Sequence, residues 1–212
     1  MESEASPSFA EADRFFIRQR VLLVANRYDV CLVNEDGRTE GERVAYVEQK
    51  RLALKEDLRF YRDDTKRQEL FRMKARQAFD PAARYAVTDS SGNPIGELGK
   101  AFGRSLARST WRMYTAEGKD LGWATERSLL RSLLRRLIGL AGLVPVVGDV
   151  IELVPIRYHF DFFVRDQKIG GLERLFGIRD RYLLDLTGDR ERAIDRRLAI
   201  ALAVAMDALQ AR

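Results

Sequence analysis

The residues of this sequence that are best suited to chemistry are basic side chains placed beside a run of leucines. Between Lys100 and Arg136 the chain carries nine basic and three acidic residues, a balance that accounts for its whole net charge of +5. From Arg127 onward, leucines recur at the three-and-four spacing of one helical face and arginines occupy the other. Such a helix can lie in a membrane interface, with its leucines in the acyl boundary and its arginines among anionic headgroups.

The candidate site residues form two groups according to what they would contact. Candidates for attracting lipid headgroups are Lys100, Arg104, Arg131, Arg135 and Arg136. Candidates for contacting a membrane or a partner are Leu130, Leu133, Leu134 and Leu137. Each basic residue near an anionic surface contributes about 1 kcal/mol, a contribution that salt screens. The pattern therefore predicts salt-sensitive binding to an anionic phospholipid or membrane surface.

The leucine face has other interpretations, which stay open. It could pack on the rest of the domain, or form a contact with a protein partner or a second copy through residues 129–141. A bilayer-spanning helix is disfavoured, because Pro145, Asp149 and Glu152 interrupt the apolar run. Nucleic-acid binding is also disfavoured, since Trp111 shares a strand face with Met113, which predicts a core position rather than a stacking platform.

Catalytic and metal-binding patterns are weak in this chain. The single histidine, His159, lies in an alternating strand-like run, and the single cysteine, Cys31, stands between two apolar residues. The acidic residues between Asp185 and Asp195 lack the spacing of a calcium loop and alternate with arginines. A helix start with Asp189 as N-cap is the preferred interpretation there. We therefore predict a non-enzymatic protein with no cofactor and no metal.

The elements that must position these residues are β-hairpins. An alternating segment led by an aromatic residue, a turn and a second short segment recur at 85–96, 111–122 and 160–170, and more loosely at 28–37 and 60–75. About five hairpins give roughly ten strands, and an antiparallel sheet of that size tends to close on itself and remove its edges. The repeats therefore predict a mainly β protein built as a closed antiparallel barrel.

The C-terminal end adds a nearly all-apolar helix, expected over about residues 190–209. Its uninterrupted apolar run, Leu198 to Met206, is nine residues long, whereas a membrane-spanning helix needs roughly 20. A helix that is apolar on all sides must be buried, and the interior of the barrel is the place for it. Leu198, Leu202 and Met206 are expected to be structural residues of this central helix.

This combination resembles the Tubby C-terminal-like superfamily, and within it the LURP-one-related proteins and the phospholipid scramblases. The resemblance rests on the Tyr85–Gly96 and Trp111–Gly122 hairpins and on the end of the chain, where Tyr182–Asp185 leads through Gly188 and Asp189 into the apolar helix. It implies a roughly twelve-stranded barrel around a hydrophobic C-terminal helix, with roles in phosphoinositide binding, lipid movement or protein interaction. The cysteine cluster that scramblases carry for palmitoylation is missing, which argues against scrambling.

Composition and the ends of the chain complete the expectations. Residues 1–13 are acidic and rich in small residues, which predicts a disordered tail, and residues 14–212 are expected to form one domain with an amphipathic insertion at about 127–156. The first residues lack the basic start and apolar core of a secretory signal, so we expect a cytoplasmic protein, peripheral to the inner face of the membrane. The predicted function is peripheral binding of anionic phospholipid, with a protein-interaction scaffold as the alternative and nucleic-acid binding as the weaker one.

Overall fold

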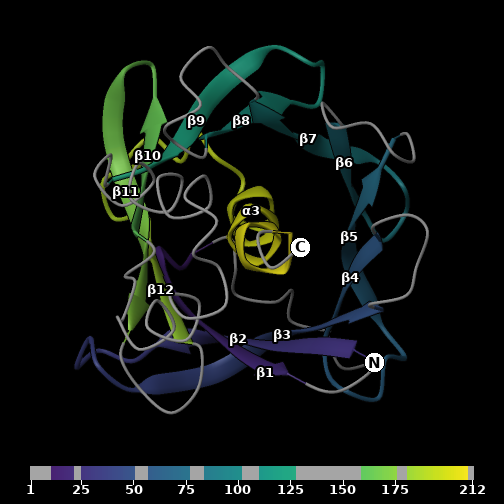
Figure 1. Ribbon diagram of the computed structural model, residues 1–212. Helices are drawn as coiled ribbons and strands as arrows, with labels where there is room; N and C mark the ends of the chain where they lie inside the picture. Colours follow the sequence, from purple (N-terminus) through teal and green to yellow (C-terminus); the bar gives the residue numbers. More distant parts are fainter. Residues whose placement is uncertain are drawn as a thin grey trace, which may run out of the picture.

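The computed structural model describes residues 11–21, 25–50, 57–76, 84–101, 110–127, 159–175 and 181–209, which form β-strands followed by one helix (Figure 1). The strands are β1 (Arg14–Val21), β2 (Ala25–Val33), β3 (Glu40–Lys50), β4 (Asp57–Tyr61), β5 (Glu69–Ala75), β6 (Arg84–Asp89), β7 (Pro94–Ala101), β8 (Thr110–Thr115), β9 (Asp120–Glu126), β10 (His159–Val164), β11 (Gln167–Leu175) and β12 (Arg181–Asp185). The helix is α3 (Arg196–Ala208).

The strands form a closed barrel. Each one pairs in antiparallel fashion with the next along the chain, and β12 pairs with β1. Phe15 of β1 lies opposite Leu184 of β12 on one side and Leu32 of β2 on the other. The predicted antiparallel barrel is therefore confirmed, and each of its twelve strands is paired on both sides (Figure 1).

The predicted hairpins supply most of the wall. The three clear repeats are β6–β7, β8–β9 and β10–β11, and the two loose repeats are β2–β3 and β4–β5. Trp111, Phe160 and Phe162 are buried, as the alternation predicts. Gly92 and Gly118 adopt φ values of 86° and 78° in the turns of two hairpins, a conformation that favours glycine.

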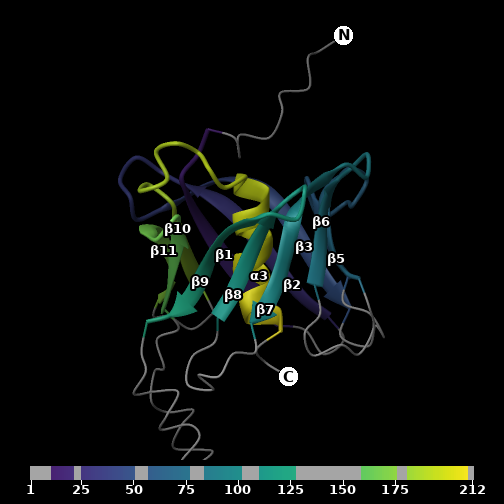
Figure 2. The ribbon, with the colours of Figure 1, turned by 90° about the horizontal axis from the view of Figure 1, so that it is seen from above.

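Helix α3 runs through the interior of the barrel (Figures 1 and 2). Leu198, Leu202 and Met206 are buried, and the alanines between them are buried as well. A Cβ atom at Gly96 of β7 would lie 3.0 Å from Leu198 Cδ2 and 2.6 Å from the carbonyl oxygen of Tyr114. The helix therefore packs directly against the β7 backbone at Gly96, where a side chain would clash. The prediction of a central apolar helix is confirmed.

The start of α3 differs from the expectation. The helix begins at Arg196 rather than near residue 190, and its N-cap is Asp195, whose side chain accepts a hydrogen bond from the Arg197 backbone N–H at 2.8 Å. The expected N-cap at Asp189 is wrong. The Asp189 carboxylate instead accepts hydrogen bonds from the backbone N–H groups of Ala193 and Ile194, which closes the loop before the helix.

The ordered chain also begins earlier than residue 14. The Asp13 carbonyl oxygen accepts a hydrogen bond from the Leu186 backbone N–H at 2.8 Å, and the Ala12 carbonyl oxygen accepts one from the Arg196 side chain at 3.2 Å. Residues 12 and 13 are therefore part of the folded structure, whereas residues 1–10 of the expected tail lie outside the described residues.

The barrel has two ends, which Figure 2 shows from the side. We call the end at which α3 begins the N-terminal rim; it carries the turns at 34–39, 62–68, 90–93, 116–119 and 165–166 and the loop at 186–195. We call the end at which α3 ends the C-terminal rim; its connections are residues 22–24, 51–56, 76–83, 102–109, 127–158 and 176–180. Of these connections, Arg76 and Arg127 belong to the described residues, so the expected insertion at 127–156 lies almost wholly outside them.

Candidate functional site

Of the predicted headgroup residues, the structure describes Lys100 alone. Lys100 is the next-to-last residue of β7 and is partly buried. The other candidates lie outside the described residues; they are Arg104, Arg131, Arg135 and Arg136, together with Leu130, Leu133, Leu134 and Leu137. Every one of them falls in the connection at 102–109 or the connection at 127–158.

The points from which these two connections leave the barrel are described. Ala101 pairs with Thr110, Thr110 pairs with Thr125, and Glu126 pairs with Phe160. Strands β7, β8, β9 and β10 are therefore consecutive neighbours in the wall, and both connections begin and end on them at the C-terminal rim. The ends of both connections therefore lie on four neighbouring strands of the twelve, at one rim.

The strand ends give the two rims opposite charge. Among the last two residues of each strand at the C-terminal rim, the basic ones whose side chains are described are Arg20, Lys74, Arg84, Lys100, Arg174 and Arg181, and the acidic ones are Asp57 and Glu126. At the N-terminal rim, the basic ones are Arg14 and Lys168, and the acidic ones are Glu40, Glu69, Asp89, Asp120 and Asp185. Basic residues dominate the first set and acidic residues the second, so the strand ends of the two rims differ in charge. Arg181 and Glu40 are the exception, because they pair with each other at 3.2 Å on the outside of the barrel.

Several basic residues near the C-terminal rim form ion pairs. Arg76 and Arg84 both pair with the single carboxylate of Glu97, which is nearly buried. Asp161 accepts hydrogen bonds from Arg127 and forms an ion pair with Lys168. Burial tends to raise the pKa of Asp161, but these hydrogen bonds outweigh it and hold the pKa below its ordinary value. Two cations share each of these carboxylates, and Arg127 also lies 3.6 Å from Glu173.

At the N-terminal rim the acidic residues before α3 are each matched to an arginine. The pairs are Asp185 with Arg14 at 3.2 Å, Asp189 with Arg196 at 2.6 Å, Glu191 with Arg165 at 3.4 Å, and Asp195 with Arg197 at 2.7 Å. Within the described part of the chain, no group of three or more His, Cys, Asp or Glu residues is placed to hold a metal ion. These carboxylates therefore serve as ion-pair partners.

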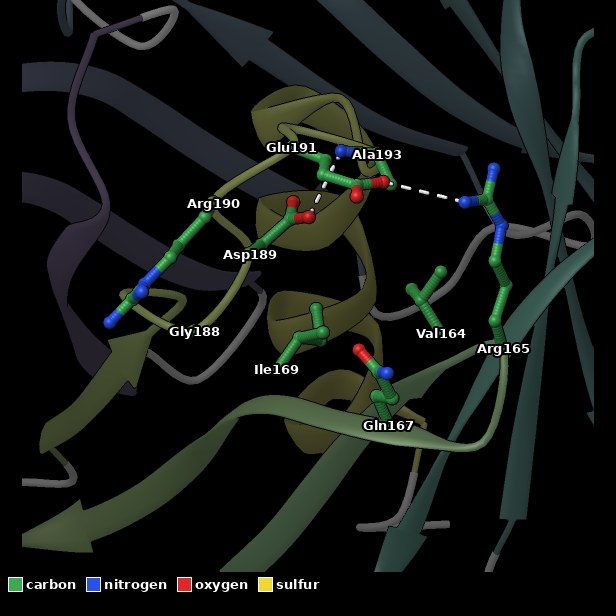
Figure 3. Close-up of a pocket in the computed structure, with 9 residues that line it drawn as sticks. All are labelled: Val164, Arg165, Gln167, Ile169, Gly188, Asp189, Arg190, Glu191 and Ala193. Atoms are coloured by element: carbon green, nitrogen blue, oxygen red, sulfur yellow. Dashed lines mark hydrogen bonds and ion pairs between the residues drawn. The ribbon is translucent and has the colours of Figure 1, made fainter.

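A pocket of about 300 Å³ opens at this rim, between the β10–β11 turn and the loop before α3 (Figure 3). Its apolar part is formed by the nearly buried side chains of Val164 and Ile169. The side-chain amide of Gln167 points toward the same space (Figure 3). The Arg165–Glu191 ion pair joins the two walls of the pocket.

The backbone on both sides of this pocket adopts conformations that are unusual for residues with a side chain. Arg165 and Asp166, the two central residues of the β10–β11 turn, have φ values of 48° and 65°. A two-residue hairpin turn with both φ values positive favours Asn-Gly, and a non-glycine residue there costs about 1 kcal/mol. In the opposite wall, Arg192 has a φ of 50°. Such conformations tend to gather at functional sites.

A buried ion pair supports the pocket from below. Arg196 contacts Asp189 through Nη1 and Asp13 through Nη2, both at 2.6 Å. It thereby ties the first turn of α3 to the loop before the helix and to the start of β1. Sequence analysis missed both the pocket and this pair. The available signal was Arg196 in the first turn of an apolar helix, where the helix dipole does not favour a positive charge.

The residues considered for catalysis take structural positions. Cys31 is buried in β2, and burial raises the pKa of its thiol. His159 begins β10, and its Nδ1 atom lies 3.5 Å from a carboxylate oxygen of Glu173.

On the outer wall, Trp123 stacks on Phe163 with ring centroids 5.4 Å apart. Among the described residues, no helix is long and apolar enough to span a membrane.

Comparison with known proteins identifies the family. No curated protein matches the chain. A family model described as LURP-one-related matches residues 43–207, a range that runs from β3 to the last turn of α3 and covers well over half of the sequence. The closed barrel and its central helix agree with the fold that the resemblance implies. The chain belongs to the LURP-one-related family.

Proposed function

We propose that this LURP-one-related barrel is a non-enzymatic protein that binds anionic phospholipid surfaces through its C-terminal rim. The observation that carries the proposal is the placement of the basic and leucine-rich connections on neighbouring strands of the rim whose strand ends are mainly basic. On this proposal the protein works at the inner face of the membrane, in the cytoplasm. The leucines would enter the acyl boundary, and the arginines would lie among the headgroups.

Polarisation of the barrel favours one orientation toward a flat anionic surface. Residues at one end of a cylinder can approach a plane together, and each basic residue near it contributes about 1 kcal/mol. Helix α3 has 13 residues, so the two rims are separated by about 20 Å along its axis. Because charges are screened over about 8–10 Å at physiological salt, the acidic N-terminal rim does not cancel the attraction of the basic one.

Liposome flotation tests the proposal. Purified protein would be floated with neutral and with anionic vesicles at low and at physiological salt. The test variant changes Arg131, Arg135 and Arg136 to Gln. The matched control changes Arg38, Arg67 and Lys119 to Gln. These residues lie in exposed turns of the N-terminal rim, and the control removes three positive charges, as the test variant does.

The expected result is flotation with anionic vesicles alone, weaker at physiological salt, lost in the test variant and kept in the control. Equal loss in both variants would mean that net charge rather than the C-terminal rim drives binding, and would overturn the proposal. Absence of flotation in every condition would also overturn it. The leucine face would then be assigned to a protein contact, and the protein would be treated as an interaction scaffold.

A further inference from the structure

We propose that the pocket at the N-terminal rim binds a small aliphatic zwitterion, of the chemical class of a free aliphatic amino acid. This site lies at the end of the barrel opposite to the proposed lipid surface, and the inference does not depend on that proposal. It rests on the apolar floor of the pocket, the two opposite charges at its mouth and its size.

The floor of the pocket selects for an aliphatic group. Val164 and Ile169 present branched side chains that are nearly buried in the core, so their exposed surface faces the pocket. Gln167 contributes the only uncharged polar side chain among the lining residues, and an amide can both donate and accept a hydrogen bond. A branched aliphatic side chain would replace water against this floor at little desolvation cost.

The mouth of the pocket offers one positive and one negative group. Arg165 Nη1 lies 3.4 Å from Glu191 Oε2, and the two side chains are 81% and 79% exposed. An ion pair with this exposure contributes little to stability, so it can open at little cost and each side chain can bind a ligand group instead. A zwitterion would place its carboxylate on Arg165 and its ammonium on Glu191, and the four charges would then alternate in sign.

The remaining charged residues of the pocket are not available in the same way. Asp189 already accepts hydrogen bonds from Ala193 N–H, Ile194 N–H and Arg196. The side chain of Arg190 points away from the other lining residues (Figure 3). A simple anion would therefore meet Glu191 beside Arg165, and a simple cation would meet Arg165 beside Glu191. A ligand that carries both charges avoids both repulsions.

The size of the pocket points to a ligand of amino-acid dimensions. Its volume of about 300 Å³ is at the lower end of the range of small-molecule sites, roughly 300–1,000 Å³. A long acyl chain would not be covered by such a pocket, whereas a branched amino acid such as leucine would be.

Isothermal titration calorimetry with four probes tests the inference. The probes are L-leucine, isocaproate, which is leucine without its amino group, isoamylamine, which is leucine without its carboxylate, and glycine, which lacks the aliphatic group. We expect leucine to bind about tenfold or more tightly than each of the other three, because each loses one of the three contacts. Shifts of the Gln167 side-chain amide signals in NMR spectra would locate the bound leucine.

Two substitutions separate the roles of the charged residues. In Glu191→Gln the ammonium loses its partner, so leucine and isocaproate should bind with similar affinity. In Arg165→Gln the carboxylate loses its partner, so leucine and isoamylamine should bind with similar affinity. The control variants Arg112→Gln and Asp120→Asn each break a different ion pair, which is half-exposed and lies on the β8–β9 hairpin, and should leave all affinities unchanged.

Three results would overturn the inference. The first is the absence of saturable leucine binding at millimolar concentrations. The second is equal binding of leucine and isocaproate, or of leucine and isoamylamine, to the unchanged protein. The third is an equal loss of leucine affinity in the control variants, which would show that the effect is not specific to the pocket.

Discussion

Arg196 Nη1 lies 2.6 Å from Asp189 Oδ2, and these two oppositely charged side chains are only 3% and 2% exposed. A buried ion pair gains little over a well-packed apolar pair, but the loss of one partner leaves an uncompensated buried charge. Here the pair connects the start of the central helix to the loop that forms one wall of the pocket. It therefore holds the helix at a defined depth in the barrel.

We expect Asp189→Asn and Arg196→Met each to lower the free energy of unfolding by about 3 kcal/mol, measured by urea denaturation. The double variant should lose less than the sum of the two single losses, because it leaves no unpaired charge. Asp13→Asn is the comparison variant: its carboxylate also contacts Arg196, but it is 37% exposed and should cost less. Additive losses would contradict a coupled pair.

Helix α3 should not tolerate charge within the barrel. Leu202 is fully buried among the residues of the core. Leu202→Asp would place an unpaired carboxylate there, and we expect it to prevent stable folding. Leu202→Met conserves volume and polarity and should cost less than about 1.5 kcal/mol. Thermal melts followed by circular dichroism measure both effects, and an unchanged melt for the aspartate variant would refute the burial of this helix face.

Stability should fall at acidic pH through carboxylates such as Asp161. Its folded pKa is held below the ordinary value of 3.8, so its contribution is fully present above that value and is lost as the pH falls through the folded pKa. We expect the free energy of unfolding to decline below about pH 4. In Asp161→Asn the decline should be shallower, as measured by urea denaturation across a pH series. An identical slope in this variant would exclude Asp161 as a contributor.

The β10–β11 turn should become more stable when its strained residues are replaced. Arg165→Asn combined with Asp166→Gly introduces the pair that the positive φ values favour, with an expected gain of about 1 kcal/mol in the free energy of unfolding. Arg165→Gln keeps the strained backbone and should give no gain. Urea midpoints compare the two variants. An unchanged urea midpoint in the double variant would contradict backbone strain in this turn.

The local pattern predicted the strands and the helix because their determinants are local. Alternation marks a strand such as β8, and an apolar run without charge marks α3. The start of α3 was harder, since Asp189 and Asp195 are both suitable N-caps and the choice depends on Arg196, which pairs with Asp189 only in the folded chain. No local pattern indicates the β1–β12 pairing, because the two strands are far apart in the sequence.

The candidate sites follow the same division. The basic stretch was visible in the sequence, but the polarisation of the rims requires the direction of every strand, which only the topology supplies. The pocket joins Arg165 to Glu191, 26 residues further along the chain, and neither residue stands in a recognisable motif. Sites built from such distant residues on two turns leave no spacing pattern that sequence reasoning could detect.

The order of the elements, with α3 after all twelve strands, has a consequence for synthesis on the ribosome. All twelve strands are translated before the helix that fills them, and β1 must wait for β12 before it can pair on its second side. The apolar inner faces of the early hairpins therefore have no core to cover them while the chain grows, and closure has a high contact order. The nascent protein should be most prone to aggregation, and most dependent on chaperones, after β12 has been made and before α3 can enter the barrel.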